Sequence, residues 1–166
     1  MKIFLIGFMG CGKSRKGKEL AARLNYPFVD TDNEIVTATG MPVTDYFALH
    51  GQAAFRQIES NVLKTLADVP DMVIATGGGL PCFFDNMEWM NANGCTIYIK
   101  MEPAALVTRL HNRDKRPLIK GMNDTELLEF IHSKLAERET YYNQAHATVE
   151  GLNLDAAKIL ENLPAQ

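Results

Sequence analysis

An eight-residue stretch near the start of the chain restricts its fold more than any other feature. Residues 7–14 read Gly-Phe-Met-Gly-Cys-Gly-Lys-Ser, the pattern of a glycine, four residues, and then Gly-Lys-Ser or Gly-Lys-Thr. Glycines at these places let successive backbone N–H groups curl around phosphate oxygens, because no β-carbon stands in the way. An apolar run precedes the stretch and a helical pattern follows it. The stretch therefore predicts a phosphate-binding loop between a buried strand and a helix.

Two side chains of this loop suggest how a nucleoside triphosphate would be held. Lys13 supplies a point charge for the terminal phosphates, and the Ser14 hydroxyl can ligate Mg²⁺. The alternative is a glycine-rich turn that spells the motif by chance, which average glycine usage makes an event of roughly one in a few hundred chains. The chain has no Asn-Lys-x-Asp base-reading motif and little room for motor machinery. A small-molecule kinase fits better than a GTPase or a larger ATPase.

Short apolar runs alternate with amphipathic stretches along the rest of the chain. This order predicts an α/β fold with a parallel sheet covered by helices on both faces. No repeat or linker divides the 166 residues, so we expect one domain over residues 1–166. The expected strands are residues 3–6, 27–29, 72–75, 96–99 and 147–149, and the expected helices are residues 14–24, 52–67, 85–93, 103–111, 124–142 and 153–163.

Composition excludes several kinds of function. A net charge of −3 argues against binding nucleic acid through a broad basic face. No run approaches the roughly 20 apolar residues of a membrane helix. The three cysteines have neither metal-ligand spacing nor an even count, so a reducing cytoplasm suits them best. We expect no nucleic-acid partner, no membrane partner and a monomer.

Asp30 and Asp32 follow the second expected strand. In an extended segment, residues two apart point to the same side, so both carboxylates can face one site. One can help to hold Mg²⁺ while the other accepts a proton from an attacking hydroxyl. The alternative is that Thr31 or Asp32 caps a helix that contains Ile35 and Val36. The functional interpretation is preferred, because ligands collect at the carboxyl ends of strands in open α/β sheets.

Arg56 and Glu59 stand three residues apart in an expected helix. From this spacing alone, a solvated surface pair is the better interpretation. Alternatively, Glu59 orients the guanidinium of Arg56 toward a substrate carboxylate.

Three consecutive glycines, residues 77–79, follow the strand at 72–75. They lose much backbone entropy on folding and suit a place where a ligand approaches the backbone closely. A flexible loop is the alternative. Further on, residues 109–121 form a basic segment in an acidic chain. Such a segment suits a lid that closes over phosphates, and a charged surface loop is the plainer alternative.

Taken in order, these motifs resemble those of shikimate kinases. The resemblance rests on Gly-Phe-Met-Gly-x-Gly-Lys-Ser, Asp-x-Asp, Phe-Arg-x-x-Glu, the triple glycine, Arg-Pro-Leu, and the late Arg138-x-x-x-Tyr142, and it spans about residues 2–142. It implies a P-loop fold of the nucleoside-monophosphate-kinase-like type, with a five-stranded parallel sheet, a mobile lid at about 112–121 and a substrate-binding region at about 31–60. The implied reaction is ATP- and Mg²⁺-dependent phosphorylation of the shikimate 3-hydroxyl, on the route to chorismate and the aromatic amino acids.

The resemblance also assigns roles by position. Gly10, Cys11, Gly12, Lys13, Ser14 and Arg15 would lie on the nucleotide, and Arg109 would stack on adenine. Ser14 and Asp30 would serve Mg²⁺. Asp32 would be the base, and Arg116 of the lid would reach both phosphate and substrate. Arg56 and Arg138 would clamp the shikimate carboxylate beside Gly78 and Gly79, which reverses the preference for a surface pair at Arg56.

Three departures from the family pattern bear on the nucleotide site. Arg15 and Lys16 replace a small hydroxyl residue and an aliphatic residue, and so change the charge next to the phosphates. Cys11 stands where alanine is usual. Lys13 and the helix N-terminus next to it can lower the pKa of its thiol, and oxidation of Cys11 would then inhibit the enzyme. The alternative is that Cys11 is a small residue with no chemical role. Residues 150–155 match the segment that contacts adenine only poorly.

Two other functions stay open at this point. Gluconate kinases and related metabolite kinases share the loop and the fold class but lack this combination of motifs. A non-catalytic nucleotide-binding module of kinase descent is the second alternative, and retention of both aspartates and of all the expected arginines argues against it.

Overall fold

The central strand of the sheet is the apolar run that precedes the glycine-rich loop. In the computed structural model, which describes residues 1–165, every residue of β1 (Lys2–Ile6) is buried. β1 pairs in parallel with β3 (Met72–Ala75) on one side and with β4 (Cys95–Lys100) on the other. β2 (Phe28–Asp30) lies outside β3, and β5 (Ala147–Glu150) lies outside β4. The order β2-β3-β1-β4-β5 is thus that of an open, wholly parallel sheet.

This sheet confirms the five-stranded parallel architecture. Each expected strand is present, and its observed ends lie within one residue of those expected. The three inner strands are continuous apolar runs because helices cover both of their faces.

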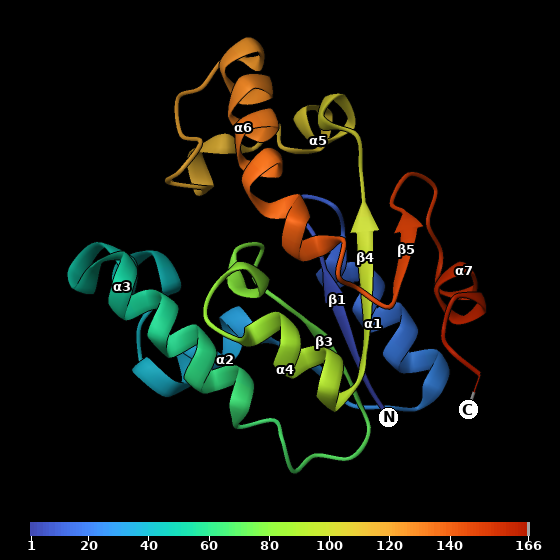
Figure 1. Cartoon of the computed structure of the whole chain (residues 1–166). Helices are drawn as coiled ribbons and strands as arrows, with labels where there is room; N and C mark the ends of the chain where they lie inside the picture. The colour runs from blue at the N-terminus through green and yellow to red at the C-terminus, as the bar shows by residue number, and fades with distance from the viewer. Residues whose placement is uncertain (166) are drawn as a thin grey trace.

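Helices cover both faces of the sheet and gather above its carboxyl edge (Figure 1). α1 (Lys13–Leu24) and α7 (Ala156–Glu161) pack together on one face, and α4 (Asn86–Asn93) lies on the other. α2 (Thr31–Thr39) and α3 (Val43–Lys64) form a separate pair at one side. α5 (Pro103–Arg109) and α6 (Asp124–Tyr142) stand beyond the ends toward which the strands point. Two 3-10 helices, η1 (Leu80–Cys82) and η2 (Arg113–Lys115), lie in the connections.

The main difference from expectation concerns the segment between β2 and β3. A helix over residues 52–67 was expected, whereas α3 begins at Val43 and is preceded by α2. α3 is not regular, because Gly51 inside it has φ 83° and ψ 175°. A helix pattern that starts after Gly51 misses the first turns, since they point in a different direction from the rest. α7 is also shorter than the expected 153–163.

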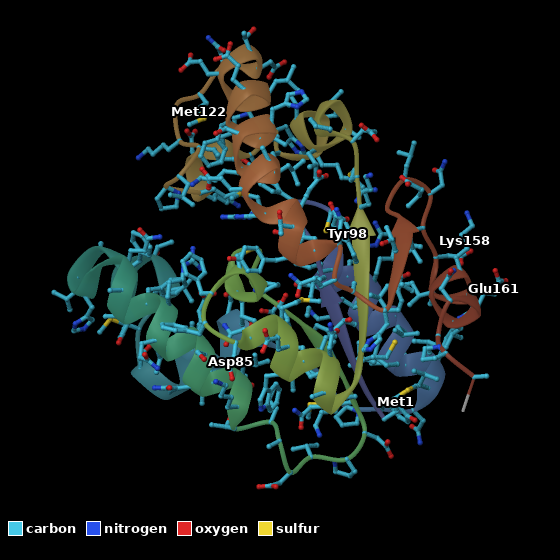
Figure 2. All side chains as sticks on the ribbon, viewed as in Figure 1. Met1, Asp85, Tyr98, Met122, Lys158 and Glu161 are labelled. Atoms are coloured by element: carbon cyan, nitrogen blue, oxygen red, sulfur yellow. The ribbon has the colours of Figure 1, made fainter. Side chains whose placement is uncertain are left out.

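Residues 112–121, the expected lid, connect α5 to α6 through η2 and a series of turns. Ile119 in this connection is fully buried, while most of its neighbours are exposed. Figure 2 labels Met122, which lies at the end of this connection, just before α6. Among residues 1–165, no helix combines the length and the apolar character needed to cross a bilayer.

Candidate functional site

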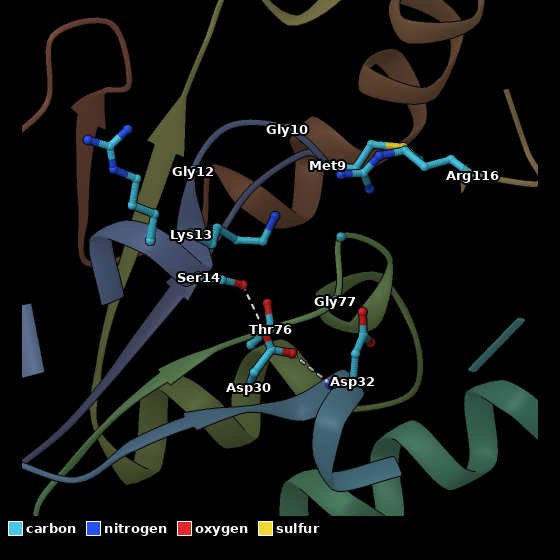
Figure 3. A pocket seen from close by; sticks show the side chains of 12 residues that line it. Met9, Gly10, Gly12, Lys13, Ser14, Asp30, Asp32, Thr76, Gly77 and Arg116 are labelled. Atoms are coloured by element: carbon cyan, nitrogen blue, oxygen red, sulfur yellow. Dashed lines mark hydrogen bonds between the residues drawn. The ribbon is translucent and has the colours of Figure 1, made fainter. Parts of the chain in front are cut away.

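A cavity of about 270 Å³ opens at the carboxyl ends of β1, β2 and β3 (Figure 3). The phosphate-binding loop forms one wall, and the acidic residues after β2 form another. Arg116 from the connection between α5 and α6 reaches it from the opposite side. The lining residues are Met9, Gly10, Gly12, Lys13, Ser14, Arg15, Asp30, Asp32, Thr76, Gly77, Gly78 and Arg116. The site therefore lies where ligands collect in open α/β sheets.

The loop has backbone conformations that require its glycines. Gly10 has φ 84° and Gly12 has φ 97°, both in the left-handed region. A β-carbon on Gly10 would lie 2.9 Å from the side chain of Leu110, so this glycine also allows close packing. Gly12 is the N-cap of α1, which places the positive end of the helix dipole at the cavity.

Lys13 is folded back over its own loop. Its ammonium group donates hydrogen bonds to the carbonyls of Gly7 at 2.7 Å and of Phe8 at 3.0 Å. The side chain is buried but lines the cavity, so its charge faces the space where phosphates would lie. Cys11 is also buried, with its sulfur 3.8 Å from the Lys13 ammonium nitrogen.

Ser14, Asp30 and the start of α2 form a short chain of hydrogen bonds, drawn in Figure 3. The Ser14 hydroxyl donates to Oδ2 of Asp30 at 2.6 Å, and Oδ1 of Asp30 accepts from the backbone N–H of Asp32 at 3.0 Å. The alternative in which Thr31 or Asp32 caps this helix is wrong, because Asp30 is the N-cap. Capping and a role at the site are therefore not alternatives, since Asp30 uses one oxygen for each.

Asp32 lies in the first turn of α2 and not in an extended segment, as its spacing from Asp30 suggested. Both carboxylates nevertheless line the cavity. Burial raises the pKa of Asp32, and the neighbouring charge of Asp30 raises it further. Lys13, Arg56 and Arg116 oppose this shift of the pKa. Asp32 is therefore a better proton acceptor than an exposed aspartate.

The oxygen atoms of Ser14 and Asp30 fit a magnesium site that is completed by substrate. Mg²⁺ in phosphotransferases is usually held by one or two protein oxygens together with phosphates and water. These two side chains already lie within hydrogen-bond distance and face the cavity. No group of three or more His, Cys, Asp or Glu side chains that could hold a metal by itself occurs in residues 1–165.

Arg56 and Glu59 are not the solvated surface pair that their spacing suggested. Nη1 of Arg56 donates to Oε1 of Glu59 at 2.6 Å, and the two side chains are only 12% and 2% exposed. The guanidinium also stacks on Phe83, 4.3 Å from the ring centre. Burial raises the pKa of Glu59 to about 7, against the opposing charge of Arg56. A guanidinium held in this way has a fixed orientation and suits binding a carboxylate.

The triple glycine lets these charged side chains approach the backbone. A β-carbon on Gly77 would lie 3.0 Å from carboxylate oxygens of both Asp32 and Glu59. A β-carbon on Gly79 would lie 2.6 Å from Nη1 of Arg56. The glycines were expected to make room for a ligand, and the groups that come close are the side chains of the site itself.

Arg138 comes to the same place from the end of α6. Its guanidinium lies over the ring of Phe8, 5.4 Å from the centre, and the residue is 8% exposed. A β-carbon on Gly78 would be 3.3 Å from its Nη1. One turn later, the Tyr142 hydroxyl donates to the Gly78 carbonyl at 2.5 Å. Arg138 and Arg56 thus both flank the glycine loop, although neither lines the cavity itself.

Arg109 and Arg15 lie at the other end of the loop. A β-carbon on Gly12 would be 3.3 Å from Nη1 of Arg109, which places that guanidinium beside the start of α1. Arg15 and Lys16 both pair with Glu19, at 3.3 Å and 2.9 Å, so the added positive charge after the loop is partly neutralised.

Two threonines contribute to the site without having been expected to. Thr31 is fully buried, and its hydroxyl accepts from the backbone N–H of Gly77 at 3.0 Å, which ties α2 to the glycine loop. Thr76 lines the cavity and donates to the Leu5 carbonyl at 3.3 Å. Thr31 lies inside Asp-x-Asp, where it was considered only as a helix cap, and Thr76 directly precedes the triple glycine.

Comparisons with known proteins agree with this geometry. The family model of shikimate kinase matches residues 9–164. The shikimate kinase of Azobacteroides pseudotrichonymphae is 44% identical over 164 residues, which is 98% of this chain and 96% of that protein. The crystal structure of shikimate kinase from Bacteroides thetaiotaomicron superposes with a TM-score of 0.90 at 40% identity, over 98% of this chain and 93% of that one. That of Acinetobacter baumannii shikimate kinase in complex with shikimate gives a TM-score of 0.85 at 32% identity, over 96% and 90%.

Proposed function

The chain belongs to the shikimate kinase family, and from that premise we propose how its residues transfer the γ-phosphoryl group of ATP to the 3-hydroxyl of shikimate. The product, shikimate 3-phosphate, lies on the biosynthetic route to chorismate and the aromatic amino acids. Phosphoryl transfer requires little covalent chemistry from the protein, so catalysis comes mainly from positioning and charge neutralisation.

The phosphate-binding loop would hold the triphosphate. The N-terminus of α1, capped by Gly12, would face the phosphates, and the Lys13 ammonium group, which now donates to two loop carbonyls, would neutralise part of their charge. Arg109 beside Gly12 is placed to cover the adenine ring, and Arg15 lies at the rim of the same cavity. Ser14 and Asp30 would hold Mg²⁺, which would supply positive charge to neutralise the phosphate oxygens.

Asp32 is the candidate general base. Its carboxylate lines the phosphate cavity, and oxygens of Asp32 and Glu59 both lie 3.0 Å from the place that a β-carbon on Gly77 would take. A hydroxyl placed beside Asp32 in this cavity would find a proton acceptor and a phosphoryl group within reach. The raised pKa of Asp32 strengthens it as a base at neutral pH.

Arg56 and Arg138 clamp the shikimate carboxylate. Both guanidinium groups are stacked on aromatic rings beside Gly78 and Gly79, and they come from segments far apart in the chain. Arg116 reaches the cavity from the opposite side, where it can stabilise negative charge on the transferred group. We further propose that the enzyme acts as a monomer in a reducing cytoplasm, which its free cysteines Cys11, Cys82 and Cys95 suit.

The observation that carries this proposal is that Asp32 lines the phosphate cavity and also lies near Glu59, the partner of Arg56, beside Gly77. A coupled ADP-release assay with ATP, Mg²⁺ and shikimate tests it, with gluconate and no acceptor as controls. Shikimate-dependent release is expected in the wild type and should be almost abolished in a folded Asp32→Asn variant. Arg56→Ala should raise KM for shikimate and leave ATP binding unchanged. Near-normal turnover in Asp32→Asn would remove the base role, and weaker ATP binding alone in Arg56→Ala would contradict the carboxylate clamp.

A further inference from the structure

Arg113 closes the base of the connection between α5 and α6. Its Nε donates to the carbonyl of Leu110 at 3.0 Å, and its Nη1 donates to the carbonyl of Met122 at 2.8 Å. Its Nη2 pairs with a carboxylate oxygen of Asp124, the first residue of α6. One side chain therefore joins the end of one helix to the start of the next, and the segment between them forms a closed loop.

Backbone hydrogen bonds also connect successive turns of this loop. The N–H of Arg116 donates to the carbonyl of Arg113 at 2.9 Å, that of Ile119 donates to the carbonyl of Arg116 at 3.1 Å, and that of Met122 donates to the carbonyl of Ile119 at 3.2 Å. These three turns carry the chain from Arg113 to Met122, and the guanidinium returns from Met122 to Arg113. Arg116 is shared by two of the turns, so its position depends on the whole ring.

Two buried side chains tie this ring to the rest of the site. Ile119 is fully buried, which anchors the far half of the loop against the core. Leu110 lies so close to Gly10 of the phosphate-binding loop that a β-carbon there would collide with it. Because Arg113 holds the Leu110 carbonyl, the base of the ring is connected to the phosphate-binding loop through one residue.

We propose that Arg113 is a positioning residue that holds residues 113–122 as one preformed unit and so sets where Arg116 meets the transferred phosphoryl group. This inference rests on the proposed function, in which Arg116 acts from that segment. A loop that is already ordered loses little conformational entropy when it closes over substrate, whereas a loose loop of the same length must be ordered in every cycle. The expected effect of losing Arg113 is therefore on turnover and not on ground-state binding.

A plain surface ion pair with Asp124 is the competing explanation. Exposed ion pairs of this kind contribute at most about 1 kcal/mol to stability. The Arg113 side chain is only 16% exposed, however, and two of its three partners are backbone carbonyls. The planar guanidinium can reach three acceptors at once, which a lysine ammonium on a single stem cannot do with the same geometry.

The test compares Arg113→Met and Arg113→Lys with Lys115→Met. Lys115 lies in the same 3-10 helix, is exposed and makes no hydrogen bond or ion pair within residues 1–165, so its replacement removes the same charge without breaking the ring. In Arg113→Met we expect kcat to fall roughly tenfold, with KM for shikimate and Kd for ATP within about twofold of the wild type. Arg113→Lys should recover part of kcat, and Lys115→Met should stay within about twofold of the wild type.

Amide hydrogen exchange supplies a direct readout of the ring. The N–H groups of Arg116, Ile119 and Met122 should exchange faster in Arg113→Met, while those of the central sheet stay protected. Unchanged exchange at these three positions, or a kcat equal to that of Lys115→Met, would overturn the inference. So would a uniform loss of protection and of every kinetic constant, which indicates a general structural role. Absence of shikimate-dependent turnover in the wild type would instead contradict the proposed function, and exchange would still decide whether Arg113 holds the loop.

Discussion

At the scale of single residues, the buried carboxyl group of Glu59 holds the guanidinium of Arg56 in position. The carboxyl is 2% exposed, and its pKa of about 7 lies well above the ordinary 4.5. Between these two values the unfolded chain has released this proton and the folded chain still holds it. The folded state therefore binds more protons, and the contribution of Glu59 to stability falls as pH rises through this window.

Glu59→Gln should remove this dependence on pH. We expect the free energy of unfolding of the wild type, relative to that of the variant, to fall by about 3 kcal/mol between pH 5 and pH 8, from the difference between 4.5 and about 7. Urea titrations of both proteins at several pH values in this range measure it. A difference between the two proteins that stays constant with pH would contradict the raised pKa.

The identities of Arg56 and Glu59 alone could not predict that this ion pair is buried. The spacing of Arg56 and Glu59 is the same for a surface pair and for a buried one. The pair is buried because α3 packs against η1 and because Gly77 and Gly79 leave room for both side chains. These are contacts between segments more than ten residues apart, which a local pattern does not contain. The family resemblance assigned Arg56 to the substrate, but only the fold shows what holds it in place.

At the scale of elements, the glycine loop after β3 determines how closely the guanidinium of Arg56 can approach the backbone. Gly79 has φ −89° and ψ −15°, which alanine adopts without strain, but its β-carbon would lie 2.6 Å from Nη1 of Arg56. Gly79→Ala should therefore fold normally and displace the guanidinium. We expect KM for shikimate to rise roughly tenfold with Kd for ATP unchanged, since a misplaced clamp affects substrate binding only.

A double-mutant cycle with Arg56→Ala isolates the cause. If Gly79→Ala acts through the guanidinium, it should change KM by less than about twofold once Arg56 is absent. An equal rise in both backgrounds would show that the added methyl group blocks the pocket directly.

The irregularity in α3 makes a second prediction at this scale. Gly51 has φ 83° and ψ 175°, a region that only glycine occupies readily, and no atom lies within 4 Å of the position of its β-carbon. Gly51→Ala should lower the free energy of unfolding by about 1–3 kcal/mol through backbone strain alone. Denaturant unfolding measures it, with the exposed neighbour Gln52→Ala as a control expected to stay within about 0.5 kcal/mol. Equal stability of the two variants would mean that α3 straightens without penalty.

The elements differ in how well the sequence predicts them, for a physical reason. The three inner strands, which are buried on both faces, are continuous apolar runs, and all five strands were located. α6 was predicted with its correct ends because Asn123 caps it and its buried face keeps a regular period. α2 appeared only as the alternative of a helix containing Ile35 and Val36, and the first turns of α3 were not predicted, because each is short and Gly40, with φ 72°, separates the two.

At the scale of the whole molecule, the site joins segments from most of the chain. The phosphate-binding loop, the start of α2, the glycine loop, the connection after α5 and the end of α6 all contribute side chains. The order of motifs was sufficient to predict the family and the fold, and both predictions are confirmed. Arg113, Thr31 and Thr76 were not predicted, because their importance lies in backbone partners that the folded chain alone brings near.

Nucleotide binding should stabilise this whole assembly through Ser14 and Asp30. With Mg²⁺ and ATP at about 100 times Kd, we expect Tm to rise by roughly 5–10 °C. Asp30→Asn retains a good helix cap but loses the carboxylate, so its own Tm should change little while the rise with Mg²⁺ and ATP becomes much smaller. Thermal unfolding with Mg²⁺ and with EDTA measures both effects. An undiminished rise in Asp30→Asn would exclude this carboxylate from the metal site.

The order of the strands in the sheet also affects how the chain folds during translation. β1 is buried along its whole length and is the first of the five strands to be synthesised, but its partners in the sheet are β3 and β4. Lys2 has no strand to pair with until Met72 has been synthesised, and Ile3 pairs on its other side with Cys95. Throughout that interval an apolar segment with unpaired backbone groups is exposed to other nascent chains. The central strand of the finished sheet thus waits longer for its partners during translation than any other strand.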